Sequence, residues 1–87
     1  MPRSLHSEDY RKLTAILLEA RTNAGLTQQQ VADRLGKPQS FVAKVEGGER
    51  RIDLVEFVAL SEALGADPRA LLDTLLGAMG GAKKSRR

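Results

Sequence analysis

An all-α fold of five helices is the architecture that the sequence predicts. Three observations predict it: apolar residues recur at three- and four-residue steps, each such stretch ends at a glycine, and no segment alternates as a β-strand would. At 87 residues the chain has room for one domain. Aromatic residues make up only 3% of the chain, so we expect an aliphatic core.

The first helix is expected to follow Ser7, a favourable N-cap residue. Glu8 and Asp9 would occupy its first turn, where carboxylates suit the positive end of the helix dipole. Gly25 ends it as a C′ glycine. Its inward stripe comprises Leu13, Ile16, Leu17, Ala20 and Ala24.

Two short helices are expected next. Thr27 is the N-cap of the second helix and Gly36 ends it. The third begins at Pro38, because a proline at the first helical position has no N–H to leave unpaired, and it runs to about Glu46, before Gly47. The apolar positions of this pair are Val31, Ala32, Leu35, Val42 and Val45.

The last two helices begin at aspartates. Asp53 caps the fourth helix and Gly65 closes it; Asp67 followed by Pro68 opens the fifth. The inward positions expected of the fourth are Leu54, Phe57, Val58, Leu60, Ser61 and Leu64. The fifth carries Leu71, Leu72, Leu75 and Leu76. We therefore expect a flexible N-terminal arm at residues 1–6, a helical domain at 7–76 and a disordered basic tail at 77–87.

Several functional classes are excluded by composition. The chain has no cysteine, and its single histidine, His6, lies in the arm, so we expect no disulfide, no metal site, no cofactor and no enzyme activity. No apolar run would cross a bilayer or act as a signal peptide, so a cytoplasmic protein is expected. Because the five expected helices account for most of the sequence, we expect no small-molecule effector. The net charge of +3 permits a polyanionic partner, although four of the fourteen basic residues lie in the last five positions.

The closely spaced second and third helices form the most informative stretch. In a helix-turn-helix, a small residue lies where the helices cross and a glycine makes the turn, which Ala32 and Gly36 provide. The surrounding motifs are Gly-Leu-Thr-Gln at 25–28, Leu-Gly at 35–36, Glu46 at the end of the third helix and Ala-Leu-Gly at 63–65. From Arg21 to about Leu76 this combination resembles the phage-repressor-like (XRE) helix-turn-helix family. The resemblance implies a compact five-helix lambda-repressor-like DNA-binding domain.

The resemblance also implies roles for individual residues. Gln28 would meet a DNA phosphate, and Arg21 with Glu46 would form a structural ion pair between the first and third helices. The exposed face of the recognition helix would comprise Gln39, Ser40, Ala43 and Lys44. Arg50 and Arg51, with the backbone near Gly47, would bind phosphate. Pro38 and Gly47 depart from the family pattern, so the cap of the third helix must come from elsewhere.

We therefore predict a transcriptional regulator that binds double-stranded DNA as a homodimer on a palindromic operator. The fifth helix has more leucine than one packing face needs, which favours pairing through Leu71, Leu72, Leu75 and Leu76. Two alternatives remain open: an antitoxin-type protein-binding module that neutralises a partner and regulates its own gene, and the controller of a restriction-modification operon. The sequence does not distinguish these three, nor does it give the operator.

Overall fold

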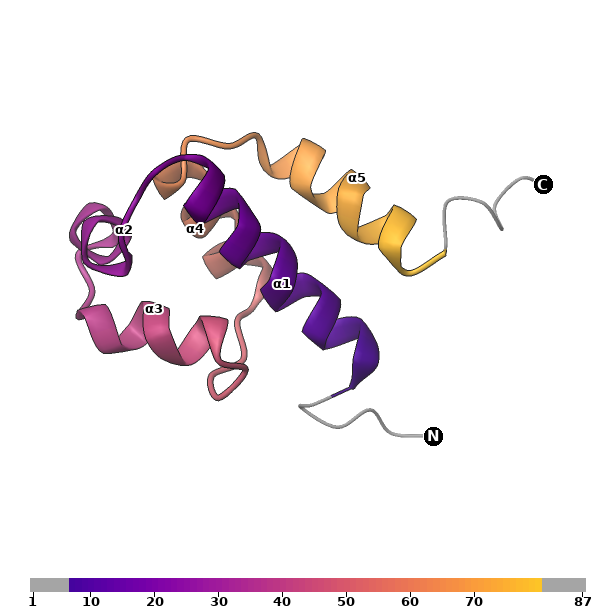
Figure 1. The fold of residues 1–87 in the computed structure, drawn as a ribbon, viewed down its shortest axis with the longest axis horizontal. Helices are drawn as coiled ribbons and strands as arrows, with labels where there is room; N and C mark the ends of the chain where they lie inside the picture. Colours follow the sequence, from indigo (N-terminus) through magenta and orange to yellow (C-terminus); the bar gives the residue numbers. More distant parts are fainter. Residues whose placement is uncertain (1–6, 81–87) are drawn as a thin grey trace.

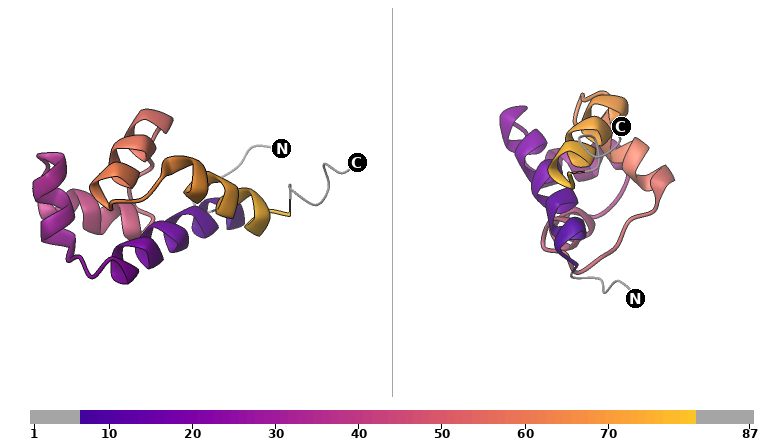
Figure 2. Two further views of the ribbon diagram at one scale, coloured as in Figure 1. Left: turned by 90° about the horizontal axis from the view of Figure 1, so that it is seen from above. Right: turned by 90° about the vertical axis from the view of Figure 1, so that its right-hand side faces the viewer.

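Five helices and no strand make up the part of the chain that the computed structural model describes, residues 7–80. In order they are α1 (Glu8–Asn23), α2 (Gln28–Leu35), α3 (Gln39–Glu46), α4 (Leu54–Ala63) and α5 (Pro68–Ala78). The long helix α1 spans the domain, with α2 and α3 at one end and α5 alongside it at the other (Figures 1 and 2). The predicted all-α, five-helix fold is confirmed.

Local signals account for where the helices begin and end. The Ser7 hydroxyl accepts a hydrogen bond from the Tyr10 N–H at the start of α1. Thr27 begins α2 with a capping box, in which its hydroxyl accepts from the Gln30 N–H and the Gln30 side chain accepts from the Thr27 N–H. Gly36 ends α2 with a φ of 68°, a left-handed conformation that favours glycine. α4 begins with a second capping box, and α5 with an aspartate followed by proline.

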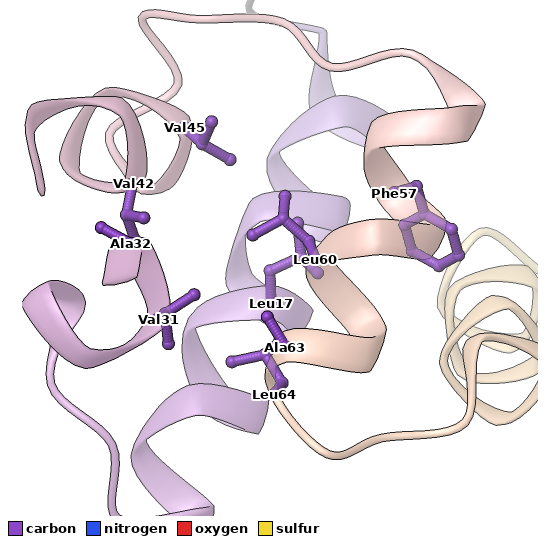
Figure 3. Close-up of a cluster of buried hydrophobic side chains, with 9 residues drawn as sticks. All are labelled: Leu17, Val31, Ala32, Val42, Val45, Phe57, Leu60, Ala63 and Leu64. Carbon is purple, nitrogen blue, oxygen red and sulfur yellow. The ribbon is translucent and has the colours of Figure 1, made fainter. Parts of the chain in front are cut away.

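The core joins α1 to α4. Nine buried apolar residues form it, and Figure 3 shows their positions on α1, α2, α3 and α4: Leu17, Val31, Ala32, Val42, Val45, Phe57, Leu60, Ala63 and Leu64. Only Phe57 among them is aromatic, so this core is aliphatic as predicted. α5 contributes no fully buried residue, although Leu71 packs against the cluster. The helix-turn-helix pair is thus held by α1 and α4, while α5 covers one side.

Several details differ from the sequence expectations. Ala24, expected on the inward stripe of the first helix, is exposed at the C-cap of α1. On α4, Leu54 is 71% exposed and Val58 is 38% exposed, because the inward stripe runs through Phe57, Leu60 and Ser61. Pro38 is the N-cap of α3 and not its first helical residue, since its ψ of 154° is extended.

α5 also continues two residues beyond the expected end at residue 76. Gly77 lies in its last turn, where a glycine is less costly than in a helix interior, and Met79 lines a surface hollow together with Tyr10 and Leu75. The helix therefore includes Gly77 and Ala78, which the sequence predicts to lie in the tail. The predicted arm at 1–6, including His6, and the basic positions of the predicted tail lie outside the described residues.

Candidate nucleic-acid interface

The helices α2 and α3 approach each other closely where they cross, because the buried side chain at the crossing is small. Ala32 has no exposed surface, and Figure 3 shows it beside Val42 of α3. A larger residue at this crossing would push the two helices apart, because protein interiors are close-packed. The turn at Gly36 then brings the chain back, and the Lys37 N–H donates to the Ala32 carbonyl at 3.0 Å. The geometry is that of a helix-turn-helix.

α3 buries one face and exposes the other. Val42 and Val45 are each 1% exposed and anchor the helix in the core. Gln39, Ser40 and Lys44 are exposed, while Ala43 is partly buried between them. All four predicted reading positions therefore occupy the outward half of α3, and they offer an amide, a hydroxyl, a methyl group and an ammonium group.

A chain of side-chain hydrogen bonds fixes the first residue of α3 to α2. The Gln39 Nε2 donates to the Gln28 Oε1 at 2.6 Å, and the Gln28 Nε2 donates to the Glu46 Oε1 at 2.8 Å. Glu46 is the last residue of α3, so Gln28 bridges the two ends of that helix. The Gln39 amide is thereby oriented before any ligand arrives.

Glu46 is held in turn by Arg21 of α1. The Arg21 Nε lies 2.6 Å from the Glu46 Oε2, and its Nη2 donates to the Oε1 at 3.0 Å. The third guanidinium nitrogen, Nη1, donates to the Leu26 carbonyl at 2.9 Å. The side chains are only 15% and 9% exposed, so this bidentate pair is largely removed from water. It joins α1, the loop before α2, and the end of α3.

The first turn of α3 is not capped by a side chain. Pro38 occupies the N-cap position and has no side-chain acceptor, whereas α1, α2, α4 and α5 are each capped by a hydroxyl or a carboxylate. The sequence predicts a cap from elsewhere in the chain, but none of the described side chains provides it. The positive end of this helix is therefore open to an external acceptor such as a phosphate oxygen.

The loop between α3 and α4 separates its two arginines. The Arg50 guanidinium lies 4.9 Å from the Phe41 ring centroid and forms an ion pair with Glu56 at 2.8 Å. The Arg51 guanidinium lies over the Tyr10 ring at 4.8 Å and forms no ion pair with a described carboxylate. These two adjacent cations, for which the family resemblance predicts the same phosphate contact, therefore lie in different surroundings.

Two residues that the sequence did not identify hold this loop. The Tyr10 hydroxyl donates to the Arg50 carbonyl at 3.3 Å and accepts from the Ile52 N–H at 3.1 Å. Glu56 accepts from the Asp53 N–H at 2.9 Å in the α4 capping box and also binds Arg50. The Asp-x-x-Glu spacing could have placed Glu56 at the start of a helix, but no local pattern connects Tyr10 to a loop forty residues away.

Residues 7–80 contain no group of three histidine, cysteine or acidic side chains that could hold a metal ion. None of the described helices is both long and apolar enough to span a membrane.

Comparisons with known proteins agree with this geometry. A family model described as helix-turn-helix matches residues 17–71. The solved structure of an XRE-family like protein from Pseudomonas syringae pv. tomato is 50% identical, with a TM-score of 0.77, over 80% of this chain and 85% of that one. The restriction-modification controller protein C.AhdI from Aeromonas hydrophila is 40% identical, with a TM-score of 0.66, over 72% of this chain and 96% of that one.

A more distant structure is that of the controller C.Esp1396I, a tetramer in complex with its natural 35-base-pair operator. It is 15% identical, with a TM-score of 0.76, over 83% of this chain and 95% of that one, and this likeness shows a shared fold. The comparison with curated proteins found no match.

Proposed function

Because the chain belongs to the XRE-type helix-turn-helix family, we propose that it is a transcriptional regulator that binds specific double-stranded DNA. The observation that carries the proposal is the Gln39–Gln28–Glu46–Arg21 chain of hydrogen bonds beneath the exposed face of α3. Such a network orients a side chain in advance, which lowers the cost of ordering it on binding. The side chain that it orients, Gln39, lies at the N-terminal end of α3, the end that enters the major groove in this motif.

In this proposal the outward face of α3 reads base edges. Glutamine binds adenine bidentately, so Gln39 is assigned an adenine contact. Lys44 donates to guanine O6 or N7, Ser40 contacts either kind of base, and Ala43 meets a thymine methyl group. Because each good contact contributes about 1–3 kcal/mol of discrimination, these few side chains suffice for a preferred sequence.

Phosphate contacts supply most of the binding energy. We assign them to Gln28, whose amide has a second N–H beside the one donated to Glu46, and to the uncapped first turn of α3. Arg51 adds a cation that no described carboxylate neutralises. The Arg21–Glu46 pair has a structural role only.

We propose that the protein acts as a dimer on a roughly palindromic site. Leu72 and Leu76 are the exposed leucines of α5, at 42% and 43%, whereas Leu71 and Leu75 turn inward. The apolar surface continues onto α4, where Val55 is 78% exposed and Leu54 lines a hollow with Leu72. Large exposed apolar patches mark interfaces, so we extend the proposed pairing surface from α5 to the start of α4. A dimer of this motif that binds two half-sites one turn of DNA apart holds its recognition helices about 34 Å apart.

A second candidate is a narrower version of the first. The 40% identity to C.AhdI, a restriction-modification controller, favours a regulator of such an operon. The DNA-binding chemistry would be the same, and the two differ in which genes carry the site. A restriction endonuclease gene beside a gene for this chain, with a selected binding site upstream of it, would support the controller function.

The test is selection of binding sites from a randomised duplex pool, followed by titration of the selected duplex at several salt concentrations. We expect a palindromic consensus, and we expect the Gln39→Ala, Lys44→Ala variant to lose that preference while it keeps weak, salt-dependent binding. The matched control, Lys12→Ala with Gln29→Ala, removes the same two groups from α1 and α2 and should select the parent consensus. Failure of the parent to select any sequence would reject the proposal and favour a protein-binding role.

A further inference from the structure

The Arg50 guanidinium already binds groups of its own chain. Its Nη2 lies 2.8 Å and its Nη1 3.3 Å from the two carboxylate oxygens of Glu56, a two-point pairing. Nη1 also donates to the Arg51 carbonyl. Three of its five N–H donors are therefore in use, and only the Nε–H and one Nη2–H remain for a phosphate oxygen.

The guanidinium also lies against the recognition helix. Its centre is 4.9 Å from the centroid of the Phe41 ring, and Phe41 is a partly buried residue of α3 that packs on the core. Lys37, just before α3, has its Nζ 5.3 Å from the same ring. The ring of Phe41 therefore contacts one cation from the residues before α3 and one from the residues after it. Of the two, Arg50 also binds α4, through Glu56.

Glu56 is fixed at the far end of this contact. It is the third residue of α4, and its Oε1 accepts from the Asp53 N–H at 2.9 Å, so a hydrogen bond independent of Arg50 also holds the carboxylate at the start of α4. The Asp53 N–H, followed by the hydrogen bond and charge of Arg50, lowers the pKa of Glu56, so the carboxylate stays ionised at neutral pH. The Arg50 charge is accordingly compensated within the fold.

We propose that Arg50 is a positioning residue that ties Phe41 of the recognition helix to Glu56 of α4, and that it is not a phosphate contact. This inference rests on the proposed DNA binding and revises the role that the sequence suggested for Arg50. α3 has eight residues and no side-chain cap, so its orientation depends on contacts outside the helix. Gln28 and Glu46 secure one side, and the Phe41–Arg50–Glu56 contact secures the middle.

The two roles of Arg50 predict opposite effects of Glu56→Gln. Glutamine keeps the capping box of α4, because its amide oxygen still accepts from the Asp53 N–H, but it removes the charge that holds Arg50. A positioning role predicts weaker binding to the selected duplex, by roughly two- to fivefold for a partly exposed pair. A phosphate-contact role predicts tighter binding, because Arg50 would be released toward the DNA.

Arg50→Lys separates the roles again. Lysine still binds phosphate as a point charge but cannot form the planar two-point pair with Glu56 or stack on Phe41 in the same way. We expect Arg50→Lys and Arg50→Ala to weaken binding to the selected duplex to the same extent. The ratio of affinities for the selected and a random duplex should fall, and the slope of log K against log salt should stay unchanged. Arg51→Ala serves as the comparison, and its slope should fall by about one.

Tighter binding by Glu56→Gln, or a salt slope in Arg50→Ala that falls as in Arg51→Ala, would overturn the inference. If the parent selects no sequence, the proposed function fails first, and the contact is then tested without DNA. In that case the unfolding midpoints of Phe41→Leu, Arg50→Ala and the double variant should be non-additive. Additive midpoints would reject the Phe41–Arg50 contact whatever the ligand.

Discussion

Replacing Glu46 with alanine should cost this domain a large part of its stability. The substitution leaves the Arg21 guanidinium, 15% exposed, without its carboxylate, and it removes the acceptor of the Gln28 amide. Removing one partner of a buried pair typically costs about 3–5 kcal/mol, because the remaining charge is uncompensated. The residual exposure of Arg21 places the expected loss at the lower end, about 3 kcal/mol.

That loss is large against the whole stability of a small domain, about 5–15 kcal/mol. For a domain of this length each kcal/mol shifts Tm by roughly 4–8 °C, so Tm should fall by at least about 12 °C. The assay is thermal and urea unfolding followed by far-ultraviolet circular dichroism. DNA binding by Glu46→Ala should weaken as well, because Gln28 and Gln39 lose their anchor.

Two further variants make the result interpretable. Glu49→Ala removes an exposed carboxylate three residues away that forms no ion pair with a described residue, so it should change stability by no more than about 0.5 kcal/mol. A double-mutant cycle of Arg21→Ala with Glu46→Ala should show strong coupling, since removing both charges leaves neither one stranded. A loss below about 1 kcal/mol in Glu46→Ala, or additive effects in the cycle, would refute the reasoning.

The remaining predictions concern the core, the turn, the α4 capping box and the pairing surface. Ala32→Leu should destabilise the domain by about 1–3 kcal/mol or more, because Ala32 has no exposed surface, and urea unfolding measures the loss. Gly36→Ala should cost about 1–2 kcal/mol by the same assay; a Cβ there meets no atom within 4 Å, so the cost is that of a φ of 68° alone. Because the pKa of Glu56 is lowered from 4.5, the ionised carboxylate stabilises the fold above that pH, and this contribution is lost as the pH falls below it. The difference in unfolding midpoint between the parent and Glu56→Gln should therefore vanish in acid. A difference that persists in acid would contradict a stabilising role for the ionised carboxylate. Val55→Glu suits the first turn of α4 and should leave the monomer folded, yet sedimentation velocity should show it as a monomer at concentrations where the parent is a dimer; an unchanged dimer would exclude this part of α4 from the interface.

Signals confined to a few neighbouring residues were sufficient for most of the fold. Thr27 with Gln30, Gly36 and Asp67 with Pro68 fix helix ends through interactions within one turn, so the sequence locates them directly. The inward face of α4 could not be located in this way. Its residues are apolar on nearly all sides, so the period of 3.6 did not distinguish buried Phe57 from exposed Leu54.

In the candidate site, too, features set by local sequence could be predicted, and contacts made through the tertiary fold could not. The outward residues of α3 follow from its buried valines and the helical period, so Gln39 and Lys44 could be placed from sequence. The partners of Arg50 could not, because Phe41 and Glu56 approach it through the tertiary fold. The Tyr10 hydroxyl on the Arg50–Ile52 backbone is a contact of the same kind. The family resemblance, together with their position in the loop after the third helix, assigns both arginines the same role.

The Gln39–Gln28 hydrogen bond also limits how the specificity of this protein could be redesigned. The exposed side chains of a recognition helix could be replaced freely if they made no contact within the fold. Here the first residue of the helix donates a hydrogen bond to an amide of α2. Any residue grafted at position 39 that lacks a donor of matching reach leaves the Gln28 Oε1 without that partner and loosens the link to Glu46. The residues at positions 28 and 39 therefore depend on each other, and libraries that vary the exposed face of α3 should vary both together.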